Sequence, residues 1–392
     1  MRNIEDELNL GEKKVLLRLD LNVPLDGGKI IDTTRIDKII PTIEFLLKNN
    51  AKIIILSHVG RPKSKIVNEL SLKPICDDLQ KKLNKEIRLI TKNPKEIDPA
   101  DLFNNQDEKI IMLENLRFYE EEEKNDTSFA KHLASFADLY VNDAFSCSHR
   151  AHASIFEITK FLPSFAGLQL SLEINALTKI TSEIKRPITC IIGGSKISTK
   201  INVIKNLMPK FDNIVIVGGM ANNILKYKGH NIGKSIKEDG CDKIIKEIFS
   251  LSKDENCKII YPEDVTIGKS LDGLPVVKEL SNVLNDELIL DIGPKTIKVI
   301  NKLIEKSNTV LWNGPAGYFE NPEFAKGSIE IIKKIIEMNK NNTIYSVAGG
   351  GDTVALLNSL GVINNFDFIS TAGGAFLEYL EGKELPGIRA LN

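Results

Sequence analysis

Short runs of nearly continuous branched apolar residues recur along this chain, and amphipathic segments of helix length separate them. Examples are "AKIIILSHVG" at 51–60, "DNIVIVGGMA" at 212–221 and "NTIYSVAGGG" at 342–351. Strands that are apolar on both faces are typical of parallel sheets with helices on both sides. We therefore predict an α/β fold with two Rossmann-like domains, each a parallel sheet covered by helices, joined by a connecting hinge helix.

The residues that follow these runs differ between the two halves of the chain. Up to Arg150 they are polar or basic, whereas after Pro187 they are mostly glycines. Between the halves, Leu170, Ile174 and Leu177 have near-helical spacing, and we expect Arg186-Pro187 to end that helix. Because ligands of open parallel sheets bind beyond the carboxyl ends of the strands, each half is predicted to hold its own site.

The glycine-rich turns of the second half suit a phosphate chain, since backbone N–H groups and helix N-termini attract anions. "AGGGDT" places Asp352 where it could hold Mg²⁺, and "GGSKISTK" places Lys196 and Lys200 four residues apart, on one face if this stretch is helical. A single Gly-Gly turn is more often simple turn geometry. Four such turns, one with an acid and one with two lysines, favour a nucleotide.

Two common nucleotide motifs fail in this sequence. The Walker pattern would need glycine at the positions of Lys228 and Glu263, and the dinucleotide pattern would need it at Val354. A conventional P-loop enzyme and a conventional nicotinamide dehydrogenase are therefore disfavoured.

The first half carries basic and polar side chains at or near strand ends. Arginine there is suited to bidentate recognition of carboxylate and phosphate, although any one arginine can be a structural ion pair. Histidines in "HRAH" at 149–152 lack a cysteine or acid at zinc-ligand spacing. The side chains of this group are Asp20, Asn22, Arg35, His58, Arg61, Arg117 and Arg150.

Composition limits the classes of partner. The net charge is −1, which favours neither nucleic acid nor a membrane surface. The five scattered cysteines form no C-x-x-C pair, the first residues lack a secretory apolar core, and the apolar runs are of strand length. We expect a cytoplasmic protein that binds no nucleic acid and no membrane.

Several blocks together resemble one known family. "RLDLNVP", "SHVGRP", "LENLRFYEEEEKND", "VNDAFSCSHRAHAS", "GGSKISTKI", "LWNGPAGYFE", "AGGGDT" and "STAGGAFLEYLEGKELPG" occur in the order and spacing of the phosphoglycerate kinases, over essentially the whole chain. The resemblance implies reversible transfer of a phosphoryl group between 1,3-bisphosphoglycerate and ADP, giving 3-phosphoglycerate and ATP, with Mg²⁺ and a monomeric enzyme. It also implies that the C-terminal segment returns to the first domain.

By this resemblance, the domains are 1–165 plus 376–392 for phosphoglycerate, 166–185 as connecting helix and 186–375 for the nucleotide. The binders of 3-phosphoglycerate or 1,3-bisphosphoglycerate are Asp20, Asn22, Arg35, His58, Arg61, Arg117 and Arg150. The binders of ADP or ATP are Lys196, Lys200, Gly218, Gly219, Asn313, Glu320, Gly349, Gly350, Gly351, Asp352 and Thr353, with Asp352 also near the metal.

Some positions depart from the usual family pattern. Ala372 and Val217 stand where glycines are usual and Phe376 where a serine is usual, and 146–148 reads Ser-Cys-Ser in place of Gly-Thr-Ala. Alanine keeps its N–H, and its cost of about 1 kcal/mol arises only where φ must be positive. We expect these changes to affect loop geometry and not the reaction class.

The expected mechanism needs no general base, because the acceptor carboxylate is already ionised near neutral pH. Arg35 and Lys196 are predicted to balance the charge of the moving phosphoryl group, and closure of the domains to exclude water. Two alternatives stay open: a dehydrogenase, which the missing third glycine disfavours, and a nucleotide-binding scaffold without turnover.

Overall fold

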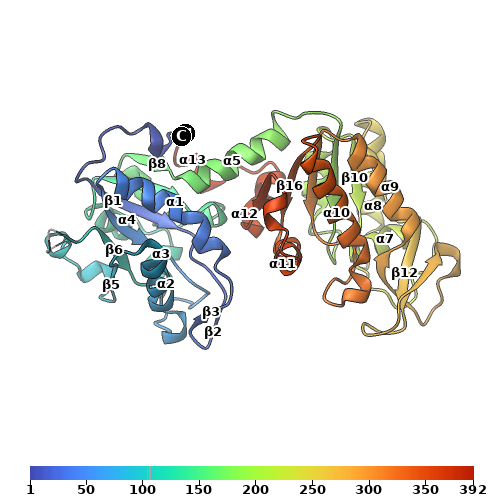
Figure 1. Cartoon of the computed structure of the whole chain (residues 1–392), viewed down its shortest axis with the longest axis horizontal. Helices are drawn as coiled ribbons and strands as arrows, with labels where there is room; N and C mark the ends of the chain where they lie inside the picture. Colours follow the sequence, from blue (N-terminus) through green and yellow to red (C-terminus); the bar gives the residue numbers. More distant parts are fainter. Residues whose placement is uncertain (104, 106) are drawn as a thin grey trace. The chain divides into compact units, whose positions relative to one another are not determined.

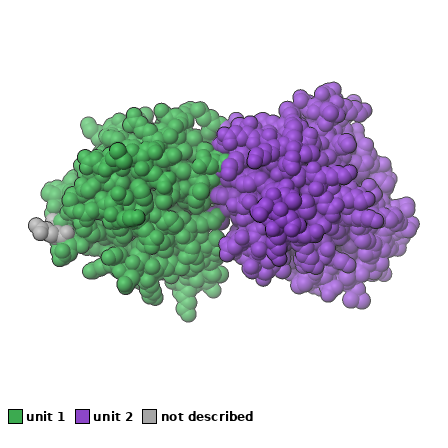
Figure 2. All heavy atoms as spheres, turned by 45° about the horizontal axis from the view of Figure 1, so that its top comes forward, with its two compact units in different colours: residues 1–175, 384–392 green, residues 176–383 purple. Residues whose placement is uncertain are grey.

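The structure is a computed structural model that describes residues 1–103, 105 and 107–392. The chain forms two compact units, unit 1 with residues 1–175 and 384–392 and unit 2 with residues 176–383 (Figure 2). Each unit is built around its own six-stranded parallel sheet, which confirms the predicted fold class (Figure 1). No helix among the described residues is both long enough and apolar enough to cross a membrane.

The sheet of unit 1 has the order β5-β6-β4-β1-β7-β8. Apolar residues on one face of β1 and β4, such as Leu17 and Ile55, are fully buried in a core shared with α1 and α2. The strands are β1 (Lys14–Leu19), β4 (Lys52–Leu56), β5 (Arg88–Ile90), β6 (Ile110–Leu113), β7 (Leu139–Asp143) and β8 (Ser164–Ala166), beside a β2 (Leu25–Asp26), β3 (Lys29–Ile30) hairpin. The helices are α1 (Thr34–Lys48), α2 (Lys73–Leu83), α3 (Glu120–Glu123), α4 (Thr127–Ala134) and α13 (Pro386–Arg389).

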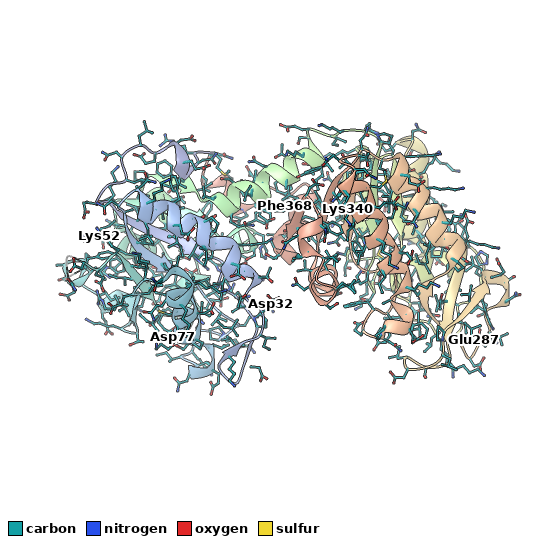
Figure 3. The ribbon with its side chains drawn as sticks, in the orientation of Figure 1. Asp32, Lys52, Asp77, Glu287, Lys340 and Phe368 are labelled. Carbon is teal, nitrogen blue, oxygen red and sulfur yellow. The ribbon has the colours of Figure 1, made fainter. Side chains whose placement is uncertain are left out.

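The sheet of unit 2 has the order β11-β10-β9-β15-β16-β17. Its strands are β9 (Ile188–Ile192), β10 (Asn213–Ile216), β11 (Lys258–Ile260), β15 (Thr309–Asn313), β16 (Tyr345–Gly349) and β17 (Phe368–Ser370), the last starting at the Phe368 labelled in Figure 3. Its helices are α6 (Ile201–Leu207), α7 (Gly219–Tyr227), α8 (Asp242–Asp254), α9 (Pro294–Lys306), α10 (Lys326–Lys340), α11 (Gly351–Ser359) and α12 (Gly373–Leu380).

Unit 2 also contains an antiparallel sheet that the sequence did not predict. Its order is β13-β12-β14, formed by β12 (Asp264–Gly268), β13 (Val276–Glu279) and β14 (Leu288–Ile292). It has a small core of its own, which includes Val265 and Ile267. This sheet supplies one wall of the pocket described below.

The predicted connecting helix is α5 (Leu168–Thr181), whose residues are divided between the two units. Residues 376–383, which the sequence grouped with the first domain, lie in unit 2. The reason is that α12 packs on α6 and the Asn206 side chain donates a hydrogen bond to the Leu380 carbonyl at 2.7 Å.

Candidate functional site

In unit 1 the basic and polar side chains gather at one edge of the sheet. The neighbouring strands β6, β4, β1 and β7 run parallel, so the loops that follow them leave from the same edge. Asp20 and Asn22 follow β1, His58 follows β4, and Arg117 lies in a 3₁₀ turn after β6. We call the group Asp20, Asn22, Arg35, His58, Arg61, Arg117 and Arg150 the basic basin.

Arg35 is held in the first turn of α1 by residues that were themselves predicted to bind substrate. Its Nη1 lies 3.3 Å from Asp20 Oδ1 and donates to the Asn22 carbonyl at 2.9 Å. The start of the helix is fixed by Asp32, labelled in Figure 3, whose Oδ1 accepts the Thr34 N–H at 2.7 Å. The guanidinium is thus oriented without being buried completely.

Hydrogen bonds tie the loops after β1, β4 and β6 together. Asn22 Oδ1 accepts the N–H of Gly60 at 2.8 Å, and Arg117 Nη1 donates to the Gly60 carbonyl at 3.0 Å. Gly60 has φ +65, and an added Cβ would meet Leu70 Cδ2 at 2.6 Å, so this turn requires glycine. By contrast, the side chains of Arg61 and Arg150 are exposed.

Beneath the basin lies a layer of buried polar groups that sequence reasoning missed. Arg18 on β1 is fully buried, and its Nη2 lies 3.0 Å from Nδ1 of His58. Burial, and then the nearby Arg18 and Arg117, lower the pKa of His58 well below its usual value. The sequence alone does not show whether an arginine within a strand has a buried or an exposed side chain.

In unit 2 the glycine turns lie at the carboxyl edge of the second sheet. β10, β9, β15, β16 and β17 are parallel neighbours, and α7, α11 and α12 begin directly after glycine or alanine turns. Gly218 has φ +66 and Gly350 has φ +97, conformations that favour glycine. Ala372 has φ −94, so this departure carries no backbone penalty, and Val217 is fully buried.

The three glycines at 349–351 differ in what surrounds them. A Cβ on Gly349 would meet the ring of Phe376 at 2.6 Å, and one on Gly350 would meet Asn313 Nδ2 at 2.7 Å. A Cβ on Gly351 would meet nothing within 4 Å. Internal packing, in which Phe376 takes part, therefore accounts for Gly349 and Gly350. Of the three glycines, only Gly351 borders open space.

Lys200 belongs to the same group of residues. Its Nζ donates to Asn313 Oδ1 at 2.7 Å, and Asn313 Nδ2 donates to the Gly349 carbonyl at 2.8 Å. Burial lowers the pKa of the Lys200 ammonium. Thr353 is buried and accepts the Gly314 N–H at 2.7 Å, so its hydroxyl fixes the loop after β15.

The expectation that Lys196 and Lys200 share a helical face is wrong. α6 begins only at Ile201, so both lysines lie in the preceding loop, and Lys196 is exposed. The loop between them is held by Glu238, whose carboxylate accepts both the N–H and the hydroxyl of Ser198. Serine and threonine in this stretch make turn contacts in place of helical ones.

A pocket of about 610 Å³ opens beside these loops within unit 2. It brings together four of the predicted residues, which are Gly218, Gly219, Glu320 and Asp352. Gly194 and Ser195 of the "GGSK" turn also line it. Its remaining lining is mainly apolar and includes Ile236, Val265, Leu288, Leu290 and Phe319, several from the antiparallel sheet. A mainly apolar pocket whose lining includes the exposed acids Glu320 and Asp352 suits a flat base joined to a polar sugar and phosphates.

Asp291 on β14 lines the pocket and was also missed. It is buried, and it accepts the N–H groups of Gly327 in α10 at 2.7 Å and of Ile292 at 2.8 Å. Burial raises its pKa to about 7. A Cβ on Gly317 would lie 2.5 Å from this carboxylate, so Asp291 supports the loop that leads to Glu320.

The donor set at the pocket is compatible with Mg²⁺. Asp352 is exposed in the first turn of α11, and the described residues contain no group of three or more His, Cys, Asp or Glu placed to hold a metal ion. Mg²⁺ is commonly bound by one or two carboxylates, water and substrate phosphates, without a cage of protein ligands. A single carboxylate beside a glycine turn at a helix N-terminus fits that pattern.

Comparison with known proteins gives a consistent result. The family model described as phosphoglycerate kinase matches residues 5–383. The phosphoglycerate kinase of Wolbachia pipientis wMel is 46% identical over 98% of this chain and 97% of its own, and that of Bartonella bacilliformis is 44% identical over 98% and 97%. The solved phosphoglycerate kinase of Coxiella burnetii is 37% identical with a TM-score of 0.89, covering 99% of this chain and 98% of its own.

Proposed function

The chain belongs to the phosphoglycerate kinase family and catalyses reversible phosphoryl transfer between 1,3-bisphosphoglycerate and ADP, and from this premise we propose which residues perform each part of the reaction. Unit 2 binds ADP or ATP, and unit 1 binds 3-phosphoglycerate or 1,3-bisphosphoglycerate. The observation that carries this assignment is the convergence of Gly218, Gly219, Glu320 and Asp352 on one pocket of about 610 Å³.

In the nucleotide site, the apolar wall takes the base and Glu320 takes the ribose hydroxyls. The phosphates lie over Gly351, where space is open, with Lys200 and the N-terminus of α11 as donors. Asn313 orients Lys200 through its 2.7 Å contact. Asp352 would hold Mg²⁺ together with the phosphates, where the ion would neutralise charge on the transferred group.

In the basic basin, Arg35, Arg61, Arg117 and Arg150 recognise the carboxylate and phosphate of phosphoglycerate. Asp20 and Asn22 act in part by holding Arg35 and the Gly60 turn, and they accept hydrogen bonds from a substrate hydroxyl. His58 adds a donor at the base of the group. The acceptor carboxylate is ionised near pH 7, so positioning and charge balance replace acid–base catalysis.

Arg35 and Lys196 carry the charge of the phosphoryl group during transfer. The contacts of Arg35 with Asp20 and Asn22 hold it in one orientation before substrate arrives, which is what electrostatic stabilisation of a transition state needs. Lys196 is exposed, so it is free to reach the phosphates. Residues 166–185 connect the domains.

The remaining features of the proposal concern the cellular setting. We propose a monomeric, cytoplasmic enzyme whose partners are its small substrates, with no nucleic acid or membrane partner. A net charge of −1 supports the absence of nucleic-acid affinity.

The decisive experiment is a coupled assay of ADP-dependent consumption of 1,3-bisphosphoglycerate with and without Mg²⁺. We expect turnover that requires Mg²⁺ and that falls on substitution of Asp352→Ala, with Asp254→Ala on the far end of α8 as the matched control. Tight Mg-ADP binding without phosphoryl transfer would support the scaffold alternative and contradict the proposal.

A further inference from the structure

The buried guanidinium of Arg18 contacts the basin from below. All three of its nitrogen positions are engaged: Nε donates to Ser154 Oγ at 2.9 Å, Nη1 donates to the Leu19 carbonyl at 2.6 Å, and Nη2 lies 3.0 Å from His58 Nδ1. The side chain is 0% exposed. Its orientation is thus determined on every side.

A buried carboxylate balances the charge of Arg18. Ser154, which accepts from Arg18, donates its hydroxyl to Glu122 Oε1 at 2.6 Å and its N–H to Glu122 Oε2 at 2.9 Å. Glu122 is itself 0% exposed. The resulting series Glu122, Ser154, Arg18, His58 is a satisfied buried polar network, and such networks fix one arrangement of their members.

The contact between Arg18 and His58 determines where the imidazole proton lies. A guanidinium has only donors, so His58 Nδ1 must accept, and a neutral imidazole whose Nδ1 accepts carries its proton on Nε2. We propose that Arg18 is a positioning residue that holds His58 in the neutral Nε2–H tautomer and so offers phosphoglycerate a fixed N–H donor. This inference rests on the proposed role of His58 in substrate binding.

The other cationic groups around His58 also disfavour a charged imidazole. Arg117 and Arg35 are further groups whose positive charge disfavours protonation of the ring. Burial lowers the pKa of the nearby His152 to about 3, so His152 is itself neutral near pH 7. Cys147 Sγ lies 4.0 Å from Nδ1. Burial raises the pKa of the Cys147 thiol, so this sulfur adds no negative charge at neutral pH. The buried carboxylate of Glu122 contacts Ser154, which accepts from Arg18, so Ser154 and Arg18 stand between Glu122 and His58 in the network.

A fixed neutral tautomer has a consequence for the reaction. His58 donates one hydrogen bond to a carboxylate or phosphate oxygen and takes no part in proton transfer, because protonating Nδ1 would set two donors against each other at 3.0 Å. Its contribution to substrate binding is therefore independent of pH over the range in which an ordinary histidine titrates.

The tautomer can be read directly by two-bond ¹H–¹⁵N correlation spectra of the full-length wild-type protein. The chain has five histidines, and the His58→Gln variant assigns the signal of His58 by its loss. We expect the pattern of an Nε2–H imidazole that does not change between about pH 5.5 and 8. A signal from Nδ1–H, or an imidazolium within that range, would overturn the inference without any test of activity.

The Arg18→Met variant tests the role of the guanidinium. We expect His58 to titrate or to show mixed tautomers, and the KM for 3-phosphoglycerate to rise about tenfold while the KM for ATP is unchanged, since one hydrogen bond to a charged group is lost or misaligned. The control is Arg88→Met, which removes an arginine on β5 of the same sheet that pairs with Glu108 at the surface. An unchanged His58 spectrum in folded Arg18→Met contradicts the inference.

Failure of the proposed function gives a different result. If His58→Gln leaves the KM for 3-phosphoglycerate unchanged, His58 does not bind substrate, although the wild-type spectrum can still show the Nε2–H tautomer. If Arg18→Met does not fold, the spectrum of the wild-type protein decides the question, because an Nδ1–H form is incompatible with the observed contact.

Discussion

Arg35 and Lys196 are given the same electrostatic task but are held in different ways. Arg35 is oriented by Asp20 and the Asn22 carbonyl, whereas Lys196 is an exposed side chain on a loop that Glu238 anchors through Ser198. A preoriented charge loses little freedom when substrate binds, and a mobile one must be ordered at that time. Arg35 and Lys196 thus differ in how they would meet the same proposed task.

We expect Arg35→Ala and Lys196→Ala each to lower kcat by on the order of 100-fold or more, since each removes charge that opposes the moving phosphoryl group. Steady-state kinetics in both directions measure the effect. The matched control is Lys333→Ala, which removes an exposed lysine on α10 paired with Glu330. Near-normal turnover in folded Arg35→Ala and Lys196→Ala would show that these roles are assigned wrongly.

A second prediction at this scale concerns Asp291 and pH. Burial raises its pKa to about 7 in the folded chain, against an ordinary value of about 3.9. Between these values the folded state binds a proton that the unfolded state lacks, so the contribution of this carboxyl to stability is greatest below about pH 4 and is lost as pH rises through about 7.

We therefore expect wild type, compared with Asp291→Asn, to lose on the order of 2 kcal/mol of unfolding free energy between pH 5 and 8. Urea unfolding across this range measures the difference, and the common background of other acids cancels in the comparison. The variant itself is less stable at low pH, because an amide cannot accept from both Gly327 and Ile292 in the same way. Parallel curves for the two proteins would contradict the raised pKa.

Residues in loops after strands were predictable, and buried polar residues within strands were not. Asp352 and Arg117 follow strand-like runs, so their placement at a sheet edge follows from topology alone. Arg18 and Asp291 lie inside β1 and β14, where alternation predicts a face but not whether a charged side chain will find a buried partner. Their roles depend on Ser154 and Gly327, which are distant in sequence.

Among the elements, the turn from β16 into α11 combines glycines that packing requires with a glycine at the proposed phosphate site. Gly350 has φ +97 and lies against Asn313, whereas Gly351 is the first residue of the helix with open space beside it. A side chain at Gly350 strains the backbone. A side chain at Gly351 occupies only the region proposed for phosphate.

We expect Gly350→Ala to lower the stability of unit 2 by about 1–2 kcal/mol or more, because alanine at positive φ is strained and its Cβ would lie 2.7 Å from Asn313 Nδ2. Gly351→Ala should melt like wild type yet raise the KM for ADP about tenfold, which corresponds to about 1.4 kcal/mol. Calorimetric melting and initial rates separate the two effects. A normal KM for ADP in Gly351→Ala would place the phosphates elsewhere.

The parallel sheets were predictable because buried strands and amphipathic helices alternate with clear periods. The antiparallel sheet was not, since β13 has mostly exposed residues. β12 is mostly buried, but its sequence DVTIG begins with an acid and ends in a glycine, so it lacks the continuous apolar run of the other buried strands. The loop before α6 was also misjudged, because Ser198 and Thr199 use their hydroxyls for contacts with Glu238 and the Lys196 carbonyl in place of helix formation.

On the scale of the whole molecule, each unit has a separate sheet and a separate hydrophobic core. The residues proposed for phosphoglycerate all belong to unit 1, and those proposed for the nucleotide all belong to unit 2. Length and the contrast between basic and glycine-rich strand ends were enough to predict two domains. The assignment of residues 376–383 was not predictable, because it depends on packing of α12 against α6.

Separate cores predict that binding at the two sites can be weakened independently. Arg61 and Glu320 have exposed side chains, so replacing either should leave both cores intact. We expect Arg61→Ala to raise the Kd for 3-phosphoglycerate about tenfold with an unchanged Kd for Mg-ADP, and Glu320→Ala to do the reverse. Isothermal titration of each binary complex measures all four constants. An exposed side chain that belongs to one site makes no contact through which it could change the affinity of the other. A variant with equally weakened affinity for both ligands would therefore show that the two sets of residues do not form separate sites.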